Sequence, residues 1–196
     1  MFGFETFESD DFLRACRLHD WKRVEHMVRA GHVDIDSMSS EHMSPLMYSV
    51  TAENDVMFDF LVGRGADLEL QGAFQETPVF WTLNSDKMLR HIILFDVNLN
   101  HQNQDGVSPL MRTIRDKNIE ASILLLDAGA DVNASDNDGS TPLMIAFEAE
   151  NLELCILCLD AGADPNAVDI YDMSVLHHAI RTYNTSFIHL LFEYDV

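Results

Sequence analysis

The sequence predicts an all-α solenoid of stacked helix-turn-helix units with protruding β-hairpin loops. One observation is a Ser/Thr-Pro fragment that recurs along the chain, with prolines at Pro45, Pro78, Pro109 and Pro142. These prolines are 33, 31 and 33 residues apart. A second signature, Gly-Ala-Asp, recurs in phase with the first and begins at Gly65, Gly129 and Gly162. Two motifs at one period indicate a repeat architecture, and a hydrophobic content of 47% is enough for a continuous core.

Each repeat begins with a helix start. A Ser or Thr hydroxyl before proline caps free backbone N–H groups, and the fixed φ of proline suits the first helical residue. A polar break and a second apolar helix follow, for example at residues 118–126. Gly129 or Gly162 ends that second helix, because glycine adopts the left-handed conformation easily. Residues 134–139 are rich in Asn, Asp and Gly, which predicts a hairpin between units.

The unit resembles the ankyrin repeat, which has a 33-residue period, a Thr-Pro-Leu-His-like start and a Gly-Ala-Asp-Val-Asn-like end. The resemblance covers nearly the whole chain and implies a single ankyrin-repeat domain over residues 1–196. This domain divides into a capping unit at 8–38 and repeats at 39–71, 72–102, 103–135, 136–168 and 169–196. The family's fold implies a curved stack of helix pairs, with hairpin tips and inner helices on a concave face.

Methionine replaces the family's histidine after Pro-Leu in three copies, at Met47, Met111 and Met144, whereas His177 keeps it. In the family this histidine ties the helix start together by hydrogen bonding. We expect the methionines only to pack, as adaptable filling of the core.

The repeat at 72–102 departs most from the others. It lacks two residues between its helices, and Asp96 stands where its neighbours have the terminating glycine. An aspartate in the left-handed conformation costs roughly 1 kcal/mol more than glycine. We therefore expect this repeat to be the weak point of the array and its hinge, with the amides of residues 82–96 exchanging hydrogen before those of 110–126.

Composition excludes several classes of function. With 33 Asp/Glu against 12 Lys/Arg the formal charge is -21, so the surface repels phosphates, and we expect no nucleic-acid binding. No run of about 18 apolar residues occurs, so we expect no direct membrane insertion. The acidic N-terminus is unlike a signal peptide. Three cysteines, an odd number, favour a reducing compartment, which is the cytoplasm, with the nucleus or a host-cell cytosol as alternatives.

No group of residues predicts catalysis. Cys155 and Cys158 have C-x-x-C spacing, but they fall within a predicted second helix, where small buried core residues are expected. The nine histidines show no metal-ligand spacing, and no nucleophile elbow, P-loop or dinucleotide-binding glycine motif occurs. We therefore expect a protein that is not an enzyme and that has no catalytic residue, cofactor or metal.

The candidate site is the concave face that the resemblance implies. The candidate partner-binding residues lie at hairpin tips or at the ends of first helices, and they are Met43, Phe74, Glu76, Asp105, Val107, Arg115, Asp138, Ile170, Tyr171, Met173 and Arg181. Large apolar residues at hairpin tips are unusual without a purpose, and we expect Phe74 and Tyr171 to be the aromatic anchors. The alternative is that single tips fold against their neighbours or are simply exposed.

Charge is unevenly distributed along the repeats. Residues 118–180 contain 12 acidic residues and no Lys or Arg. Arg17, Arg115 and Arg181 occupy equivalent places at the ends of first helices, where they either bind partner carboxylates or tie neighbouring hairpin aspartates together as a structural ladder. We expect the partner to be a protein with a basic, partly apolar patch.

Three functions follow from these patterns. The first is a non-catalytic protein-protein interaction module that binds its partner on the concave face. The second is an N-terminal scaffold or targeting arm of a larger enzyme, channel or bacterial effector, and the third is an acidic nucleic-acid mimic that acts as an inhibitor. The apolar helix at 187–194 needs a cover, which is either further chain or a second copy through self-association.

Overall fold

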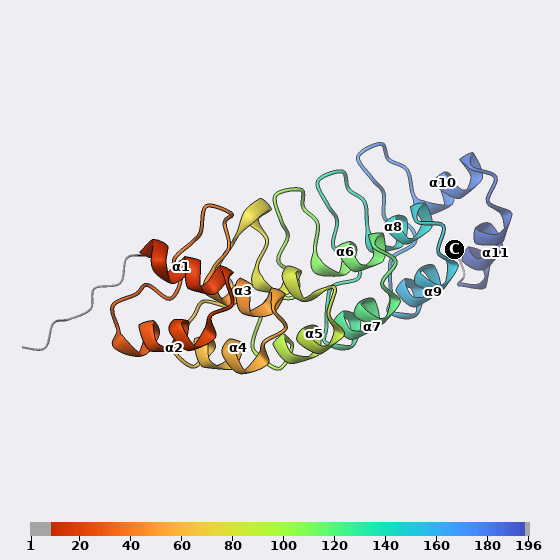
Figure 1. The fold of residues 1–196 in the computed structure, drawn as a ribbon. Helices are drawn as coiled ribbons and strands as arrows, with labels where there is room; N and C mark the ends of the chain where they lie inside the picture. Colours follow the sequence, from red (N-terminus) through yellow and green to blue (C-terminus); the bar gives the residue numbers. More distant parts are fainter. Residues whose placement is uncertain (1–8, 195–196) are drawn as a thin grey trace, which may run out of the picture. The chain divides into compact units, whose positions relative to one another are not determined.

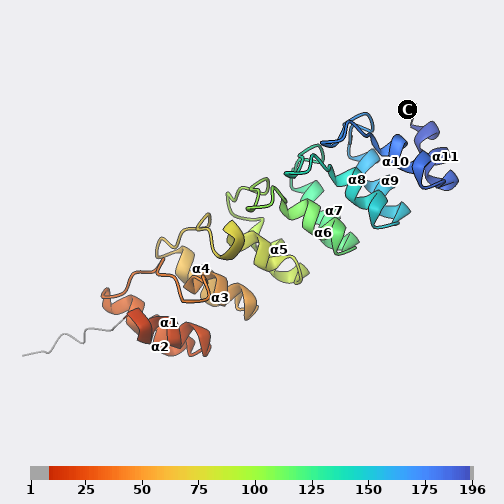
Figure 2. The same cartoon turned by 90° about the horizontal axis from the view of Figure 1, so that it is seen from above.

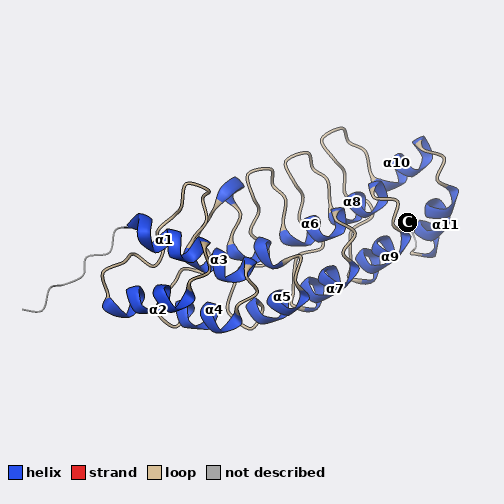
Figure 3. Cartoon of the chain, in the orientation of Figure 1, coloured by secondary structure: helices blue, strands red, loops and turns tan. Residues whose placement is uncertain are grey.

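The structure is a computed structural model that describes two compact units, unit 1 at residues 9–97 and unit 2 at residues 98–194. Residues 1–8 and 195–196, where the predicted capping unit starts and the last predicted repeat ends, lie outside the described residues. In the described part of the chain the regular structure is helical, and no strand occurs there (Figure 3). The all-α prediction is therefore confirmed.

Unit 1 consists of helix pairs that follow one another along the chain (Figure 1). Its helices are α1 (Ser9–Arg17), α2 (Trp21–Ala30), α3 (Pro45–Thr51), α4 (Asp55–Val62) and α5 (Asp86–Ile92), with the short 3-10 helices η1 (Ala73–Gln75) and η2 (Pro78–Thr82). A first helix packs against its own second helix and against the next first helix, so α1 contacts α2 and α3, and α3 contacts α4 and η2. The side chains fully enclosed in this core include Phe12, Met27, Phe58, Leu61 and Leu89.

Unit 2 has the same arrangement (Figure 2). Its helices are α6 (Pro109–Arg115), α7 (Ile119–Asp127), α8 (Pro142–Glu148), α9 (Leu152–Asp160), α10 (Val175–Arg181) and α11 (Thr185–Glu193). Here α6 packs against α7 and α8, α8 packs against α9 and α10, and α10 packs against α11. The ring centroids of Phe147 and Phe187 lie 4.7 Å apart, so these two side chains join the last two helix pairs within the core.

The predicted helix starts are confirmed in three repeats. Ser44, Ser108 and Thr141 each accept a hydrogen bond from the amide three residues further on. Proline follows each of them as the first helical residue. The hydroxyl thereby satisfies one of the amides that the first turn leaves without an intrahelical partner.

Methionine does more at these helix starts than fill space. The amide of the capping serine donates to Sδ of Met47 at 3.5 Å in one repeat and to Sδ of Met111 at 3.4 Å in another. In the last repeat the amide of Ser174 donates to Nδ1 of His177 at 3.2 Å. The thioether therefore replaces imidazole as a weak acceptor for the capping amide. The prediction that methionine only packs is wrong at these two positions.

The repeat at 72–102 has an incomplete first helix. This helix is only the 3-10 helix η2, and its N-cap residue Thr77 accepts no hydrogen bond through its side chain. The Thr77 hydroxyl is buried and has no hydrogen-bond partner in the described chain. Because a buried unpaired hydroxyl costs free energy, this geometry supports the expected weak point, which stays a prediction until hydrogen exchange is measured.

The second helix of this repeat ends without the left-handed residue that the sequence predicts. The first glycines of the Gly-Ala-Asp signature, Gly65, Gly129 and Gly162, have φ values of 91°, 93° and 88°, whereas Asp96 does not take a positive φ. The amide of Val97 instead donates to the carbonyl of Phe95 at 2.9 Å, which turns the chain tightly. The predicted cost of a left-handed aspartate is therefore wrong, because the chain avoids that conformation.

We expect Thr77→Val to raise the free energy of unfolding by about 1 kcal/mol, since it removes a buried hydroxyl that has no partner while keeping the side-chain shape. The matched control is Thr141→Val at the equivalent helix start, where the hydroxyl accepts from the amide of Met144. That variant should lose about 1 kcal/mol. Urea unfolding followed by circular dichroism compares the two, and an equal loss in both variants would show that Thr77 is hydrogen-bonded after all.

Candidate functional site

The hairpins of unit 2 share one conformation. They span residues 103–107, 136–140 and 169–173, and the amide of the first residue donates to the carbonyl of the fifth at 3.0, 3.1 and 3.1 Å. The side-chain oxygen of the first residue, which is Asn103, Asp136 or Asp169, accepts from the amides of the third and fifth residues. A short polar side chain at the first position therefore holds each tip, as the turn chemistry predicts.

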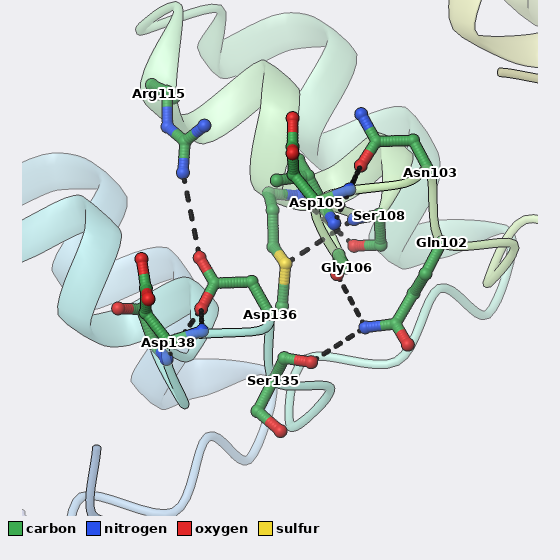
Figure 4. A network of polar contacts seen from close by, with 12 residues as sticks. Gln102, Asn103, Asp105, Gly106, Ser108, Arg115, Ser135, Asp136 and Asp138 are labelled. Carbon is green, nitrogen blue, oxygen red and sulfur yellow. Dashed lines mark hydrogen bonds and ion pairs between the residues drawn. The ribbon is translucent and has the colours of Figure 1, made fainter. Parts of the chain in front are cut away.

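Neighbouring hairpins of unit 2 are joined by backbone hydrogen bonds, and we call this arrangement the hairpin ladder. The amide of Asn137 donates to the carbonyl of Asp105 at 3.2 Å, and the amide of Ile170 donates to the carbonyl of Asp138 at 3.1 Å. The side chain of Gln102 adds two bonds, at 2.6 and 2.7 Å, to a carbonyl in each of two successive loops (Figure 4). These links hold the hairpin tips in one register.

Arginine side chains connect first helices to hairpins within each unit. In unit 2, Nη2 of Arg115 lies 3.7 Å from Oδ2 of Asp136, whose other oxygen holds its hairpin (Figure 4). In unit 1, Nη1 of Arg17 lies 3.8 Å from Oε1 of Glu41, which also belongs to a hairpin. Both contacts fit the structural-ladder alternative. Both arginines are about half exposed, so solvent screens these ion pairs, and each contributes at most about 1 kcal/mol.

Arg181 takes part in a different series of contacts. Its Nη2 lies 3.0 Å from Nδ1 of His178, and Nε2 of His178 lies 2.8 Å from Oδ2 of Asp169. Because arginine only donates, Nδ1 accepts from it and the imidazole proton resides on Nε2, which donates to the carboxylate. The series Arg181–His178–Asp169 therefore ties the last hairpin to α10.

Asp169 is the buried end of this series. Burial by itself raises the pKa of its carboxyl, but hydrogen bonds from the amide of Met173, the side chain of His178 and the amide of Tyr171 outweigh that effect. Together they hold the pKa of Asp169 below its ordinary value of 3.8. The carboxylate is therefore ionised in the folded protein near neutral pH.

We expect Asp169→Asn to lower the free energy of unfolding by about 1–2 kcal/mol at neutral pH, because an amide in place of the second oxygen cannot accept from His178. A carboxyl whose pKa is lowered by folding contributes stability above its unfolded pKa and loses it as the pH falls through its folded pKa. The difference between wild type and variant should therefore be constant above about pH 5 and shrink below about pH 3.8.

Urea unfolding at several pH values measures this difference. The matched control is Asp136→Asn, because Oδ2 of Asp136 faces only the exposed Arg115 at 3.7 Å. The control should lose less stability than Asp169→Asn. A difference between wild type and Asp169→Asn that grows toward low pH would contradict the assignment of an ionised Asp169.

The structure divides the predicted partner-binding residues into an exposed group and a buried group. The exposed residues are Phe74, Asp105, Arg115, Asp138, Ile170, Tyr171 and Arg181, while Met173 is half-buried. The side chains of Met43, Glu76 and Val107 are only 6%, 9% and 3% exposed, which fits the alternative in which single tips fold against their neighbours. Each of these three directly precedes the N-cap of a first helix, where a side chain turns under the hairpin. An apolar residue at that position is a known signal for packing on the first turn, and it predicts this burial for Met43 and Val107.

Phe74 occupies an unusual hairpin in unit 1. Phe74 and Gln75 both have positive φ values, 57° and 60°, and the Phe74 side chain is 61% exposed. Gly72 explains why this hairpin differs, because a Cβ there would lie 2.6 Å from the carbonyl oxygen of His42. An Asn or Asp therefore cannot begin this hairpin as it does in unit 2. The left-handed conformation of a residue other than glycine costs roughly 1–3 kcal/mol, and here it presents an aromatic ring to solvent.

Each unit has a groove at two successive first helices, α1 and α3 in unit 1 and α8 and α10 in unit 2. The groove in unit 1 has a volume of about 440 Å³, and its lining includes Arg14, Arg17 and Tyr48. The groove in unit 2 has a volume of about 420 Å³ and is lined by Phe147, Glu148, Glu150, His178, Arg181, Thr182 and Asn184. Sequence reasoning did not single out Glu148 and Glu150, although both belong to the stretch without Lys or Arg.

The cysteines offer no reactive thiolate. Cys16, Cys155 and Cys158 are free and buried, and burial raises the pKa of each thiol to about 12. A thiol with so high a pKa is a poor nucleophile near neutral pH. Within residues 9–194, no three His, Cys, Asp or Glu side chains are placed to hold a metal ion. No helix in the same range has the length and apolar character needed to cross a membrane.

Comparisons with known proteins agree with this arrangement. Residues 79–169 match the family model described as ankyrin repeats. No curated protein matches the chain. The ankyrin repeat protein EF0377 is 22% identical with a TM-score of 0.82, over 96% of this chain and 100% of that one. An ankyrin repeat domain from Acinetobacter baumannii AYE is 24% identical with a TM-score of 0.82, and the match covers 96% of this chain and 99% of that domain. The ankyrin repeat domain of Bcl-3, a member of the IkappaB protein family, is 26% identical with a TM-score of 0.78, and the match covers 86% of this chain and 78% of that one.

Paired helices with capped starts and protruding hairpins define a helical repeat protein with a candidate interaction surface in each unit. Residues 79–169 therefore match ankyrin repeats in sequence, and the fold of the described chain is that of the ankyrin repeat solenoids. Ankyrin repeats are in general protein-protein interaction modules, and their fold is typically non-catalytic.

Proposed function

We propose that this chain is a non-catalytic interaction module that binds a protein partner through its hairpin tips and inner helices. The observation that carries the proposal is the exposure of large apolar side chains at the tips, namely Phe74 in unit 1 and Ile170 and Tyr171 in unit 2. Asn, Asp or Gly suits a solvated tip better. Exposed aromatic residues are enriched among the few residues that dominate the affinity of an interface.

The partner in this proposal is a protein with a basic, partly apolar surface. The exposed carboxylates of Asp138, Glu148 and Glu150 lie at a tip and in the groove of unit 2, and they belong to the stretch 118–180, which contains no Lys or Arg. Asp105 adds a carboxylate at the preceding tip. Complementary charge speeds the encounter and selects the partner, while the apolar anchors supply most of the affinity. We place the interaction in a reducing compartment, the cytoplasm, because the cysteines are unpaired.

The test is the double variant Phe74→Ala with Tyr171→Ala in a pull-down from a lysate of the source cells. We expect it to lose the partner, with affinity reduced at least about tenfold, while its melting temperature is unchanged, because both side chains are exposed. The control replaces Leu94 and Tyr183, which are 79% and 87% exposed and lie outside the hairpins. Retention of the partner by the hairpin variant, or equal loss in the control, would move the site elsewhere.

The alternatives make different predictions. A scaffold or targeting arm would use the same tips, so the same double variant tests it. A nucleic-acid mimic would bind a protein that DNA competes away, with a steep dependence on salt and no dependence on Phe74. Self-association through residues 187–194 would cover Phe192, the exposed aromatic of α11, and sedimentation velocity at rising concentration would detect it.

A further inference from the structure

Unit 2 has a second pocket, which adjoins the groove between α8 and α10. The pocket has a volume of about 270 Å³ and lies where the turn between α8 and α9 meets the turn between α10 and α11 (Figure 1). Phe147, Glu150 and Asn184 line both the pocket and the groove, so the two hollows meet at these residues. Both are formed between two consecutive helix pairs, and we call them together the turn groove.

The inner part of the pocket is apolar. Its lining includes Phe147, Cys155 and Phe187, whose side chains are buried, and Leu152, which is exposed at the start of α9. Pockets with an apolar lining and a few polar groups at the edge are typical binding sites for apolar groups. A single large aliphatic side chain, such as that of leucine, suits a pocket of this volume.

Two glutamates border this apolar part. Glu150 lines the pocket and the groove, and Glu148 lines the groove. Both are exposed, and within residues 9–194 neither carboxylate takes part in a hydrogen bond or an ion pair. Arg181, which belongs to the α10 side of the groove, already donates to His178. The turn groove therefore offers two free carboxylates beside an apolar pocket.

The repeat itself does not require carboxylates at these two positions. Glu148 ends α8, whereas Arg115 and Arg181 end α6 and α10 at the equivalent position. A basic residue suits the C-terminal end of a helix, because the free carbonyls there carry a partial negative charge. Glu150 has the same left-handed turn conformation as Lys117, with φ values of 53° and 57°. The two carboxylates are therefore a property of this groove and do not serve the fold.

We propose that the turn groove binds a segment of a basic protein partner in which an apolar side chain stands next to an arginine. The apolar side chain enters the pocket and packs against Phe147 and Phe187. The guanidinium group, whose planar fork presents five N–H donors, donates to the carboxylates of Glu148 and Glu150. This proposal rests on the interaction function proposed above and adds a docking site apart from the hairpin tips, with the chemistry of the segment that it takes.

The test uses a defined probe, a capped tetrapeptide of glycine, leucine, arginine and glycine in that order. It is titrated at physiological salt into the full chain, with the amide resonances of residues 147–155 and 182–187 followed by NMR. Two further peptides are controls. One has citrulline in place of arginine, which keeps the shape and removes the charge, and the other has serine in place of leucine.

The variant Glu148→Gln with Glu150→Gln removes both charges from the turn groove. Its fold should be retained, because both side chains are exposed and no hydrogen bond in residues 9–194 depends on them. The matched control is Asp127→Asn with Glu193→Gln, which removes two exposed charges at the ends of α7 and α11. These two residues line neither the groove nor the pocket.

We expect the leucine-arginine peptide to shift the resonances of the turn groove, and both control peptides to bind at least about tenfold more weakly. The Glu148→Gln with Glu150→Gln variant should also bind at least about tenfold more weakly, while the control variant changes the affinity by less than about twofold. Equal binding of the citrulline or the serine peptide, equal loss in the control variant, shifts confined to other residues, or no binding at all would each overturn the proposal.

A second copy of the chain is the competing occupant. Sedimentation velocity that finds a wild-type dimer, absent in the Glu148→Gln with Glu150→Gln variant, would assign the turn groove to self-association and overturn the peptide proposal. The proposed function fails separately. A natural partner that binds this variant as well as it binds the wild type would leave the interaction function standing and remove only the docking site.

Discussion

Phe187→Ala is expected to lower the free energy of unfolding by about 3–5 kcal/mol. The Phe187 side chain is 2% exposed, and its ring lies 4.7 Å from that of Phe147 between centroids. Truncation to alanine removes apolar contacts from both helix pairs and leaves a cavity that a close-packed core fills only in part. In a repeat array each helix pair is stabilised chiefly by its neighbours, so this loss should loosen the last pair first.

The matched control is Phe192→Ala on the same helix, α11, where the side chain is 64% exposed. It should change the free energy of unfolding by less than about 1 kcal/mol, because little area is returned to water. Urea unfolding followed by circular dichroism measures both variants, and hydrogen exchange locates the loss. A control that loses as much as Phe187→Ala would mean that the exposed and buried faces of α11 have been assigned wrongly.

Gly106→Ala is expected to lower the free energy of unfolding by about 2–5 kcal/mol. Gly106 has a φ of 76°, and a Cβ there would lie 2.6 Å from the backbone nitrogen of Asn137. The substitution therefore combines the cost of a left-handed alanine with a clash against the backbone of the next hairpin. It should separate the two hairpins and weaken the hydrogen bond from Asn137 to the carbonyl of Asp105.

The control for this variant is Gly129→Ala, which isolates the conformational cost. Gly129 also has a positive φ, 93°, but nothing lies within 4 Å of the position a Cβ would take. Only the left-handed penalty of about 1–2 kcal/mol should appear there. Thermal unfolding compares the two variants, and hydrogen exchange at Asn137 should increase in Gly106→Ala alone. Equal losses would show that the hairpins are not in close contact.

The helical repeat was predictable because its signals are local. A hydroxyl before proline caps a helix, and a glycine after the second helix ends it, whatever the rest of the chain does. The irregularity of the repeat at 72–102 was also visible, since the spacing between Pro78 and Pro109 is 31 instead of 33 residues. How the chain accommodates the shorter spacing could not be predicted. Asp96 avoids the left-handed conformation through a backbone hydrogen bond between its two neighbours, Phe95 and Val97.

The candidate site was predictable only in part. Sequence position places Met43 and Val107 at hairpins just as it places Ile170 and Tyr171 there. The difference is made by packing, because the residue before a helix cap turns inward while the second and third hairpin positions point outward. The role of the Met47 and Met111 sulfurs as hydrogen-bond acceptors could not be predicted either, because each side chain must fold back onto its own helix start.

The sequence by itself determined that this chain is a helical repeat protein, where its helices start and that its surface is acidic. Those properties follow from periodicity, capping chemistry and charge, which act over a few residues or over the whole composition. The tertiary structure alone decided which tip residues face solvent and that Arg115 contacts the neighbouring hairpin through Asp136. Each of these depends on contacts between residues about one repeat apart, and such contacts exist only once the repeats have stacked.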